Sequence, residues 1–307
     1  MEKVIVIAGP TASGKTSLSI ELAKEIDGEI ISADSMQIYK DMDIGTAKVT
    51  KEEMEGIKHY LVDFIEPTKR YTVSDFKRDS ISAIKEILSK GKTPIVVGGT
   101  GLYINSLVYG IDYQDMEFDL NYRNEIMNKA KTEEGLKKLY DEAVKIDKVA
   151  MEKISSNDKK RICRILEIYK ATGKTKTEME VLSKKNKPEY NFLKFAIDMK
   201  RDVLYDRINK RVDIMIESGL VDEVKNILKK YNESPTAMQA LGYKEVKEYL
   251  DGKINYEEMI EKIKQESRRY AKRQFTWFRE NNDYIWLDSQ NGTGENVKLI
   301  LKELYSA

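Results

Sequence analysis

Apolar residues along the chain alternate between short β-branched runs and segments with helical spacing. Residues 3–8 read Lys-Val-Ile-Val-Ile-Ala and end at a glycine, a pattern typical of a strand buried on both faces of a parallel sheet. The following segment, 17–26, carries Leu18, Leu22 and Ile26 at helical spacing. The chain therefore opens with a strand, a glycine-rich loop and a helix.

The same alternation continues over the first 110 residues. Strands are predicted at 29–34 and 94–97, and a helix at 73–88 lies between them in the sequence. Strands that alternate with helices indicate a parallel sheet covered by helices on both faces. We therefore predict an α/β fold for this part of the chain.

A long all-helical pattern then interrupts the α/β pattern. From Leu120 to Lys185 the apolar positions keep helical periods and no β-branched run occurs. Strand character returns afterwards, with strands at 192–199 and 284–287, helices at 202–219, 221–231 and 256–280, and a closing helix. We predict an α/β core formed by residues 1–112 and 190–307, and a helical insertion formed by residues 113–189.

The net charge conceals a division between these parts. The 307 residues hold 53 Lys and Arg against 52 Asp and Glu, a formal net charge of +1. Residues 1–120 hold 14 basic and 20 acidic side chains, residues 121–187 hold 18 and 11, and residues 188–307 hold 21 and 21. The predicted insertion is the basic part. Its excess charge suits a nucleic-acid partner, although a solvated helical surface gives the same pattern.

Cysteine content and hydropathy exclude several classes of protein. The single cysteine, Cys163, rules out an internal disulfide framework and a zinc site built on cysteine pairs, and it fits a reducing compartment. The longest apolar runs, at 4–8 and 95–97, are far shorter than the ~20 residues that cross a bilayer. We expect no signal peptide, no membrane segment and a cytoplasmic location.

A phosphate-binding motif follows the first strand. The residues Gly9, Pro10, Thr11, Ala12, Ser13, Gly14, Lys15 and Thr16 fit the pattern G-x-x-x-x-G-K-[ST] between a strand and a helix. Backbone N–H groups in such a loop surround a phosphate group, Lys15 adds positive charge, and the Thr16 hydroxyl is a ligand for Mg²⁺. The motif specifies a diphosphate or triphosphate ligand, but not the bond that is broken.

The residues at the ends of two predicted strands indicate which reactions the phosphate site could support. The strand at 94–97 ends in Gly98-Gly99-Thr100 in place of the carboxylate that binds Mg²⁺ in ATP-hydrolysing proteins. Asp34 is the last residue of the strand candidate at 29–34, at the sheet edge where α/β proteins bind ligands. It could take a proton from an acceptor group, or simply form a turn or cap a helix.

Five motifs follow one another along nearly the whole chain. The first joins the phosphate loop to residues 32–39 (Ser-Ala-Asp-Ser-Met-Gln-Ile-Tyr), and the others are residues 98–103, 157–167, 239–244 (Gln-Ala-Leu-Gly-Tyr-Lys) and 270–279. In this order they resemble the motifs of the tRNA dimethylallyltransferase (tRNA isopentenyltransferase) family. Lys160 stands where the family usually has glutamine.

The resemblance implies transfer of a dimethylallyl group from dimethylallyl diphosphate to N6 of the adenosine beside the tRNA anticodon, with Mg²⁺ as cofactor. It implies a P-loop NTPase-like core and an insertion that binds the anticodon stem-loop. We expect a monomer, because nothing in the sequence requires a larger assembly. The residues that the resemblance assigns to catalysis are Asp34, Thr100 and Arg123, and those at the diphosphate are residues 9–16 and Arg201. Those assigned to tRNA are Asp34, Ser35, Met36, Gln37, Lys160, Arg161, Ile162, Cys163, Arg164, Gln239, Ala240, Leu241, Gly242, Tyr243 and Lys244.

Two other functions fit part of the same pattern. A P-loop small-molecule kinase would use the same fold for phosphoryl transfer, and a non-catalytic RNA-binding protein would use the loop as a switch. In the helix at 256–280 we expect Phe275 and Phe278 to pack in the core and the interleaved Arg and Lys residues to be available to the tRNA backbone. We expect His59 to be structural and Cys163 to be a buried, neutral thiol.

Overall fold

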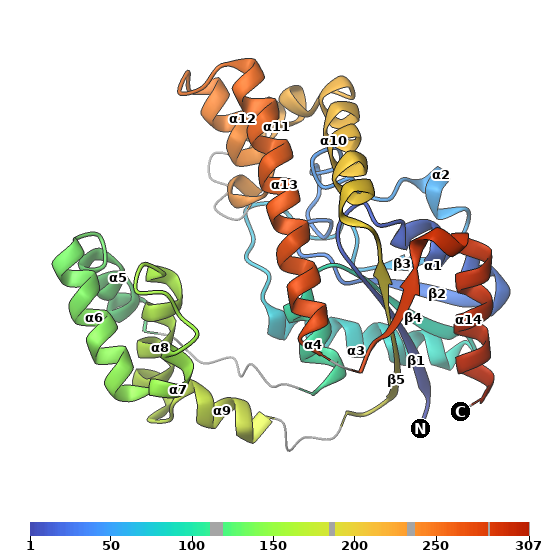
Figure 1. The fold of residues 1–307 in the computed structure, drawn as a ribbon, viewed down its shortest axis with the longest axis horizontal. Coiled ribbons are helices and arrows are strands. Elements are labelled where there is room, and N and C mark those ends of the chain that lie inside the picture. Colours follow the sequence, from blue (N-terminus) through green and yellow to red (C-terminus); the bar gives the residue numbers. More distant parts are fainter. Residues whose placement is uncertain (111–118, 184–187, 232–236, 282, 307) are drawn as a thin grey trace. The chain divides into compact units, whose positions relative to one another are not determined.

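The computed structural model describes residues 1–110, 119–183, 188–231, 237–281 and 283–306. The chain forms two compact units, one made of residues 1–107 with 189–307 and the other of residues 108–188 (Figure 1). The sequence placed the boundaries at 113 and 190, and residue 113 lies outside the described residues.

Within the described residues of the first unit, six strands form one parallel sheet in the order β3-β2-β4-β1-β5-β6. The strands are β1 (Lys3–Ala8), β2 (Gly28–Ser32), β3 (His59–Tyr60), β4 (Thr93–Gly98), β5 (Asn191–Asp198) and β6 (Ile285–Asp288). Because all strands run in the same direction, their carboxyl ends lie along one edge. Strands β2, β4 and β1 are consecutive neighbours in the sheet. The segments that follow these three strands therefore begin next to one another.

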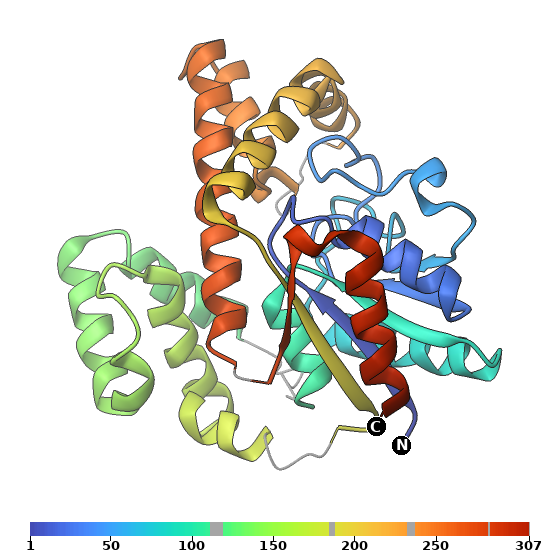
Figure 2. The same ribbon diagram turned by 45° about the vertical axis from the view of Figure 1, so that its right-hand side comes forward.

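Helices cover both faces of this sheet, as predicted. Helices α1 (Lys15–Glu25) and α14 (Gly292–Ser306) lie over one face and α3 (Val73–Ser89) over the other (Figure 2). The other helices of this unit are α2 (Lys51–Met54), α4 (Gly101–Val108, which reaches the start of the second unit), α10 (Arg201–Glu217), α11 (Leu220–Lys230), α12 (Tyr243–Leu250) and α13 (Tyr256–Arg279), with 3₁₀ turns at Ala237–Gln239 and Ser289–Asn291.

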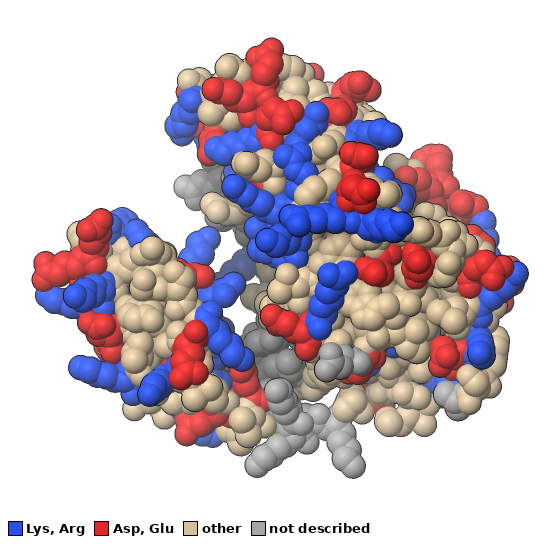
Figure 3. Space-filling view, in the orientation of Figure 1, with Lys and Arg blue, Asp and Glu red and all other residues tan. Residues whose placement is uncertain are grey.

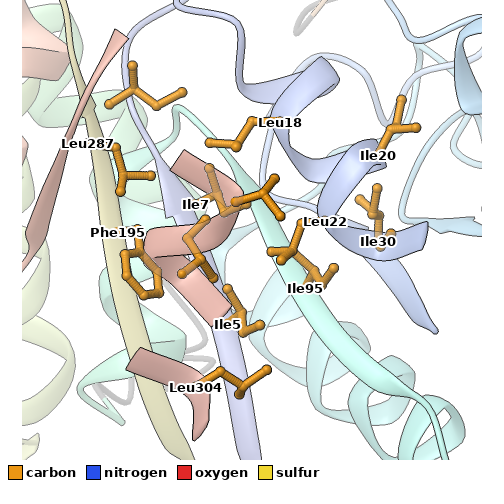
Figure 4. Packing of buried hydrophobic residues seen from close by; sticks show 14 residues of the cluster. Ile5, Ile7, Leu18, Ile20, Leu22, Ile30, Ile95, Phe195, Leu287 and Leu304 are labelled. Carbon is orange, nitrogen blue, oxygen red and sulfur yellow. The ribbon is translucent and has the colours of Figure 1, made fainter. Parts of the chain in front are cut away.

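Alternate residues of the central strand face the two helical layers. Ile5 and Ile7 pack against Leu22 of α1 in a fully buried cluster (Figure 4). The intervening residues Val4 and Val6 are equally buried and point to the opposite face. Burial on both faces explains the unbroken apolar run in the sequence, and each such side chain contributes about 1.5–3 kcal/mol.

A second apolar cluster joins the segment after β2 to the helices that follow β5. Ile38, Tyr39 and Met42 pack with Leu220 and Tyr243, and all five are almost completely buried. The segment that contains Asp34 is therefore anchored on residues from α11 and α12, although about 180 residues separate them in the sequence.

The second unit contains helices and no strand over its described residues. They are α5 (Leu120–Lys129), α6 (Glu133–Ile146), α7 (Lys148–Met151), α8 (Lys159–Thr172) and α9 (Lys176–Ser183). Ile126, Leu139, Ala143, Ile162 and Leu166 form the centre of their core. No helix in the described part of either unit combines the length and the hydropathy of a bilayer span.

Candidate active site at the carboxyl edge of the sheet

The loop between β1 and α1 has the backbone shape of an anion cradle. Gly9, Ala12 and Gly14 have positive φ angles of 152°, 62° and 93°, and successive turns of this kind point N–H groups toward one centre. Helix α1 begins at Lys15, and the first N–H groups of a helix lack helical acceptors. The Ser13 hydroxyl is buried and has no hydrogen-bond partner within the described structure. The loop is therefore suited to a phosphate group.

Two cations lie at this loop. Lys15 Nζ donates to the carbonyl oxygen of Pro10 at 2.6 Å, and Arg211 Nη1 from α10 donates to Thr11 Oγ1 at 3.2 Å. Burial, together with the charge of Arg211, lowers the pKa of Lys15 to about 7, against the opposing effect of Asp34. Burial also lowers the pKa of Arg211. Burial and mutual repulsion make these two positive charges unfavourable in the free protein. Binding of an anion would therefore stabilise the site.

Asp34 lies just beyond the end of β2. Its Oδ1 accepts a hydrogen bond from Met36 N at 2.8 Å and a longer one from Gln37 N at 3.4 Å. No donor to Oδ2 occurs in the described part of the chain. Asp34 can therefore both form a turn and act as a proton acceptor, because one carboxylate oxygen accepts the turn hydrogen bonds and the other is available to accept a proton.

Thr100 is brought to Asp34 by hydrogen bonds between two strand ends. Thr100 N donates to the carbonyl oxygen of Ala33 at 3.2 Å, and Thr100 Oγ1 accepts from Ser35 N at 3.1 Å. Tyr270 of α13 interacts with the Thr100 side chain, and burial beside Asp34 raises the pKa of its hydroxyl to about 12. Asp34, Thr100 and Tyr270 thus gather at one edge of the sheet.

The glycine pair at the end of β4, Gly98 and Gly99, explains why a carboxylate is missing there. A Cβ atom on Gly98 would lie 2.3 Å from the carbonyl oxygen of Ala33, and one on Gly99 would lie 2.1 Å from Gln274 Nε2. Only glycine permits such close approach. The turn is packed against β2 and α13 and has no room for a side chain that binds a metal.

Gln274 is a residue of the site for which no role was predicted. It is buried on α13, its Oε1 accepts from Thr11 N at 2.9 Å, and its Nε2 donates to the carbonyl oxygen of Gly99 at 2.9 Å. One amide thus links the phosphate loop to the turn after β4. The motif at 270–279 was the only feature of the sequence that pointed to Gln274. Its partners Gly99 and Thr11 lie 175 and 263 positions away in the sequence.

Arg201 is not among the residues that contact the phosphate loop in the described structure. It is exposed at the start of α10, where its Nε donates to the hydroxyl of Tyr205 at 3.0 Å. Arg211 contacts the loop, and Arg207 Nη2 would lie 3.8 Å from a Cβ atom on Gly14. The diphosphate contact of Arg201 stays a prediction.

Arg123 lies on α5 of the helical unit. Its Nη1 is 3.5 Å from Oε2 of the buried Glu167, and Arg164 Nη1 is 3.4 Å from the same oxygen. Glu167 therefore holds two of the arginines predicted to act on substrate. The catalytic role of Arg123 stays a prediction.

The predicted tRNA-binding residues differ in exposure. On α8, Lys160 and Arg161 are exposed, but Ile162 and Cys163 are buried in the helical core. The prediction for these two side chains is corrected on this point, because a helix that turns Lys160 and Arg161 outward turns the next two residues inward. Cys163 is a free cysteine, so its expected burial is confirmed, and burial raises the pKa of its thiol.

The motif at 239–244 shows the same division. Gln239 and Lys244 are exposed and Leu241 is half-buried. Ala240, Gly242 and Tyr243 are buried, and the Tyr243 hydroxyl donates to Glu223 of α11. Contacts with RNA from this motif would therefore come from its first, third and last residues.

Basic side chains gather where α10 and α13 lie side by side (Figure 3). Arg269, Lys272 and Arg273 of α13 are exposed. On the same helix Phe278 is fully buried and Phe275 is half-buried against the α10 cluster, as predicted. His59 is also structural, because it pairs with β2 as part of β3 and its Nδ1 is 2.9 Å from the carbonyl oxygen of Ile57.

A phosphate loop after the central strand, with a carboxylate at the end of a nearby strand, defines a P-loop α/β protein with an anion site beside an acceptor site. The chain matches the family model described as IPP transferase over residues 37–281. It belongs to that family.

Relatives and solved structures agree with this assignment. The chain is 50% identical over 307 residues to a tRNA dimethylallyltransferase of Acetivibrio thermocellus, and this alignment covers 98% of each chain. It is 50% identical over 296 residues to that of Carboxydothermus hydrogenoformans, covering 96% of this chain and 95% of the relative. The structure of a tRNA isopentenylpyrophosphate transferase from Bacillus halodurans matches with a TM-score of 0.75 and 42% identity, over 100% of this chain and 98% of that one. A eukaryotic dimethylallyltransferase acting on tRNA matches with a TM-score of 0.80 and 33% identity, over 98% and 78%.

Proposed function

We propose that this protein transfers the dimethylallyl group of dimethylallyl diphosphate to N6 of the adenosine next to the anticodon in tRNA and releases diphosphate. It would act as a monomer in the cytoplasm. The observation that carries the proposal is the carboxylate of Asp34 beside a cationic phosphate loop, at one sheet edge in a member of the IPP transferase family.

At the donor end, the departing diphosphate gains negative charge as the allylic C–O bond breaks. The N–H groups of residues 12–16, the Lys15 ammonium and the Arg211 guanidinium supply opposing charge in a half-buried place. These groups bind the leaving group more strongly as the reaction proceeds.

Thr16 fits the protein side of a Mg²⁺ site. Its hydroxyl is exposed in the first turn of α1, and Mg²⁺ commonly takes one or two protein oxygens with substrate phosphates and waters. The described residues hold no group of three His, Cys, Asp or Glu that would bind a metal by themselves. When bound, the ion would neutralise charge on the diphosphate.

At the acceptor end, the exocyclic amine of adenine is a weak nucleophile. We assign Asp34 Oδ2 to accept its proton as the new C–N bond forms, while the Thr100 hydroxyl orients the reacting group. The bond from the allylic carbon to oxygen breaks, the bond to N6 forms, and the proton passes to Asp34. The base must leave its stack in the RNA loop to reach this edge.

Incubation with dimethylallyl diphosphate labelled in the allyl group, Mg²⁺ and unmodified tRNA tests the proposal. The label is expected to appear in tRNA. If the label stays in dimethylallyl diphosphate while ATP labelled in its γ-phosphate modifies a small acceptor, the protein is a kinase and the proposal is wrong.

A further inference from the structure

A carboxylate from a distant helix binds the backbone of the loop after the Asp34–Gln37 segment. Glu223 of α11 accepts hydrogen bonds from three successive backbone N–H groups, those of Asp43, Ile44 and Gly45, at 2.9, 2.7 and 3.1 Å. Hydrogen bonds to an ionised acceptor are stronger than neutral ones. Glu223 therefore fixes the backbone of residues 43–45.

Tyr243 completes this arrangement from α12. Its hydroxyl donates to Glu223, and its ring packs so closely that a Cβ atom on Gly45 would lie 2.4 Å from ring carbon Cε2. Burial and the charge of Glu223 raise the pKa of the Tyr243 hydroxyl well above its usual value. The hydroxyl thus stays protonated and remains a donor at neutral pH.

The next two residues of the loop hold Gln37. Gln37 Nε2 donates to the carbonyl oxygens of Thr46 and Ala47, at 3.3 and 3.1 Å. Since the nitrogen end of the amide is occupied, Gln37 Oε1 is left to accept a hydrogen bond from a substrate. An acceptor at this place favours an amine over a carbonyl oxygen, which is how adenine differs from guanine at position 6.

We propose that Glu223, with Tyr243, is a positioning residue for the acceptor base. It fixes residues 43–47 and so holds the Gln37 amide with its oxygen available to the exocyclic amine. This inference rests on the function proposed above. It concerns the acceptor side, because Glu223 touches neither the phosphate loop nor Asp34 in the described structure.

The test compares Glu223→Ala with Asp222→Ala. Asp222 is the neighbouring acidic residue of α11, its partner is Lys225 at 3.0 Å, and it makes no bond to residues 43–47. Both substitutions remove one negative charge, but only the first releases the loop. Steady-state rates are measured at varied tRNA and at varied dimethylallyl diphosphate, with the melting temperature of each variant.

We expect Glu223→Ala to lower kcat/KM for tRNA about tenfold or more, the size expected when an orienting group is misplaced. The KM for dimethylallyl diphosphate should change much less, because residues 43–47 reach the donor site only through the long hydrogen bond from Arg211 Nη2 to the Ala47 carbonyl oxygen at 3.4 Å, and the bond from Arg211 to Thr11 does not depend on Glu223. Asp222→Ala should match the wild type in both. If a folded Glu223→Ala enzyme matches Asp222→Ala, or loses kcat/KM equally for both substrates, the positioning role is refuted.

Two milder variants keep the test decisive if Glu223→Ala does not fold. Tyr243→Phe keeps the ring beneath Gly45 and removes one donor, and Glu223→Gln keeps one acceptor oxygen. Both should reduce kcat/KM for tRNA in the same selective way, and wild-type values in both would overturn the inference. A wild-type enzyme that transfers no label would refute the proposed function, whereas an active wild type with unaffected variants refutes this inference alone.

Discussion

Binding of inorganic diphosphate to the loop at residues 9–16 is expected to take up a proton at Lys15. Burial and Arg211 lower the pKa of this lysine to about 7 in the free protein. A bound diphosphate brings negative charge against the ammonium group and raises that pKa again. The contribution of the Lys15 charge to diphosphate affinity is therefore complete below pH 7 and is lost as the pH rises above 7.

The size of the effect follows from the pKa of the free protein. At pH 8 a lysine with a pKa of about 7 is protonated only to about one tenth, so a return toward its ordinary value takes up about 0.9 proton. Between pH 7 and the pKa of the complex, the affinity should fall by up to about tenfold for each pH unit.

Calorimetric titration with diphosphate and Mg²⁺ at pH 8, in Tris and in HEPES, measures this uptake, because the two buffers differ in ionisation enthalpy. Lys15→Arg is the matched control, since arginine keeps the charge but does not titrate. It also reports any proton exchanged by diphosphate itself. The wild type should take up about 0.9 proton more than the variant. Equal uptake by the two proteins would refute the assignment of a depressed pKa to Lys15.

Four further substitutions test separate parts of the structure. Asp34→Asn keeps the acceptor of the Met36 turn but removes the base, so kcat should fall about 100-fold or more with tRNA affinity nearly unchanged in a binding assay. Gln274→Leu leaves one loop N–H and one turn carbonyl without partners, and urea unfolding should show a loss of about 2–5 kcal/mol. Gly98→Ala should destabilise by about 3 kcal/mol or more through its contact with a backbone carbonyl, whereas the control Gly294→Ala in α14, with its nearest neighbour at 3.6 Å, should be neutral or stabilising by up to about 1 kcal/mol. Arg161→Ala should reduce the slope of log affinity for tRNA against log salt concentration by about one, and an unchanged slope would show that this side chain is merely solvated.

Much of the fold could be predicted because its signals are local. Strands buried on both faces must be apolar at every position, and this requirement located β1 and β4 to within a residue or two. The phosphate loop has a fixed spacing between a strand and a helix, and Asp34 lies at the end of a strand. Parallel strands then bring such residues to one edge without any knowledge of distant contacts.

Contacts between distant segments could not be predicted in this way. Gln274 and Glu223 act through backbone N–H and carbonyl groups, which carry no residue-specific signal in a sequence. The glycines at the end of β4 showed that a metal-binding carboxylate was missing, but only the structure shows that the Ala33 backbone requires a glycine at Gly98. On α8 the family motif named a continuous segment, whereas helical geometry buried Ile162 within it.

The mass of the nucleosides in tRNA shows whether this protein transfers a dimethylallyl group to adenosine. Unmodified tRNA is incubated with this protein, dimethylallyl diphosphate and Mg²⁺, then digested and measured before and after the reaction. We expect that one adenosine per tRNA, next to the anticodon, gains the mass of one dimethylallyl group, and that the Asp34→Asn protein leaves it nearly unmodified. An unchanged adenosine mass with the wild-type protein, at full occupancy of both substrates, would contradict the proposed function.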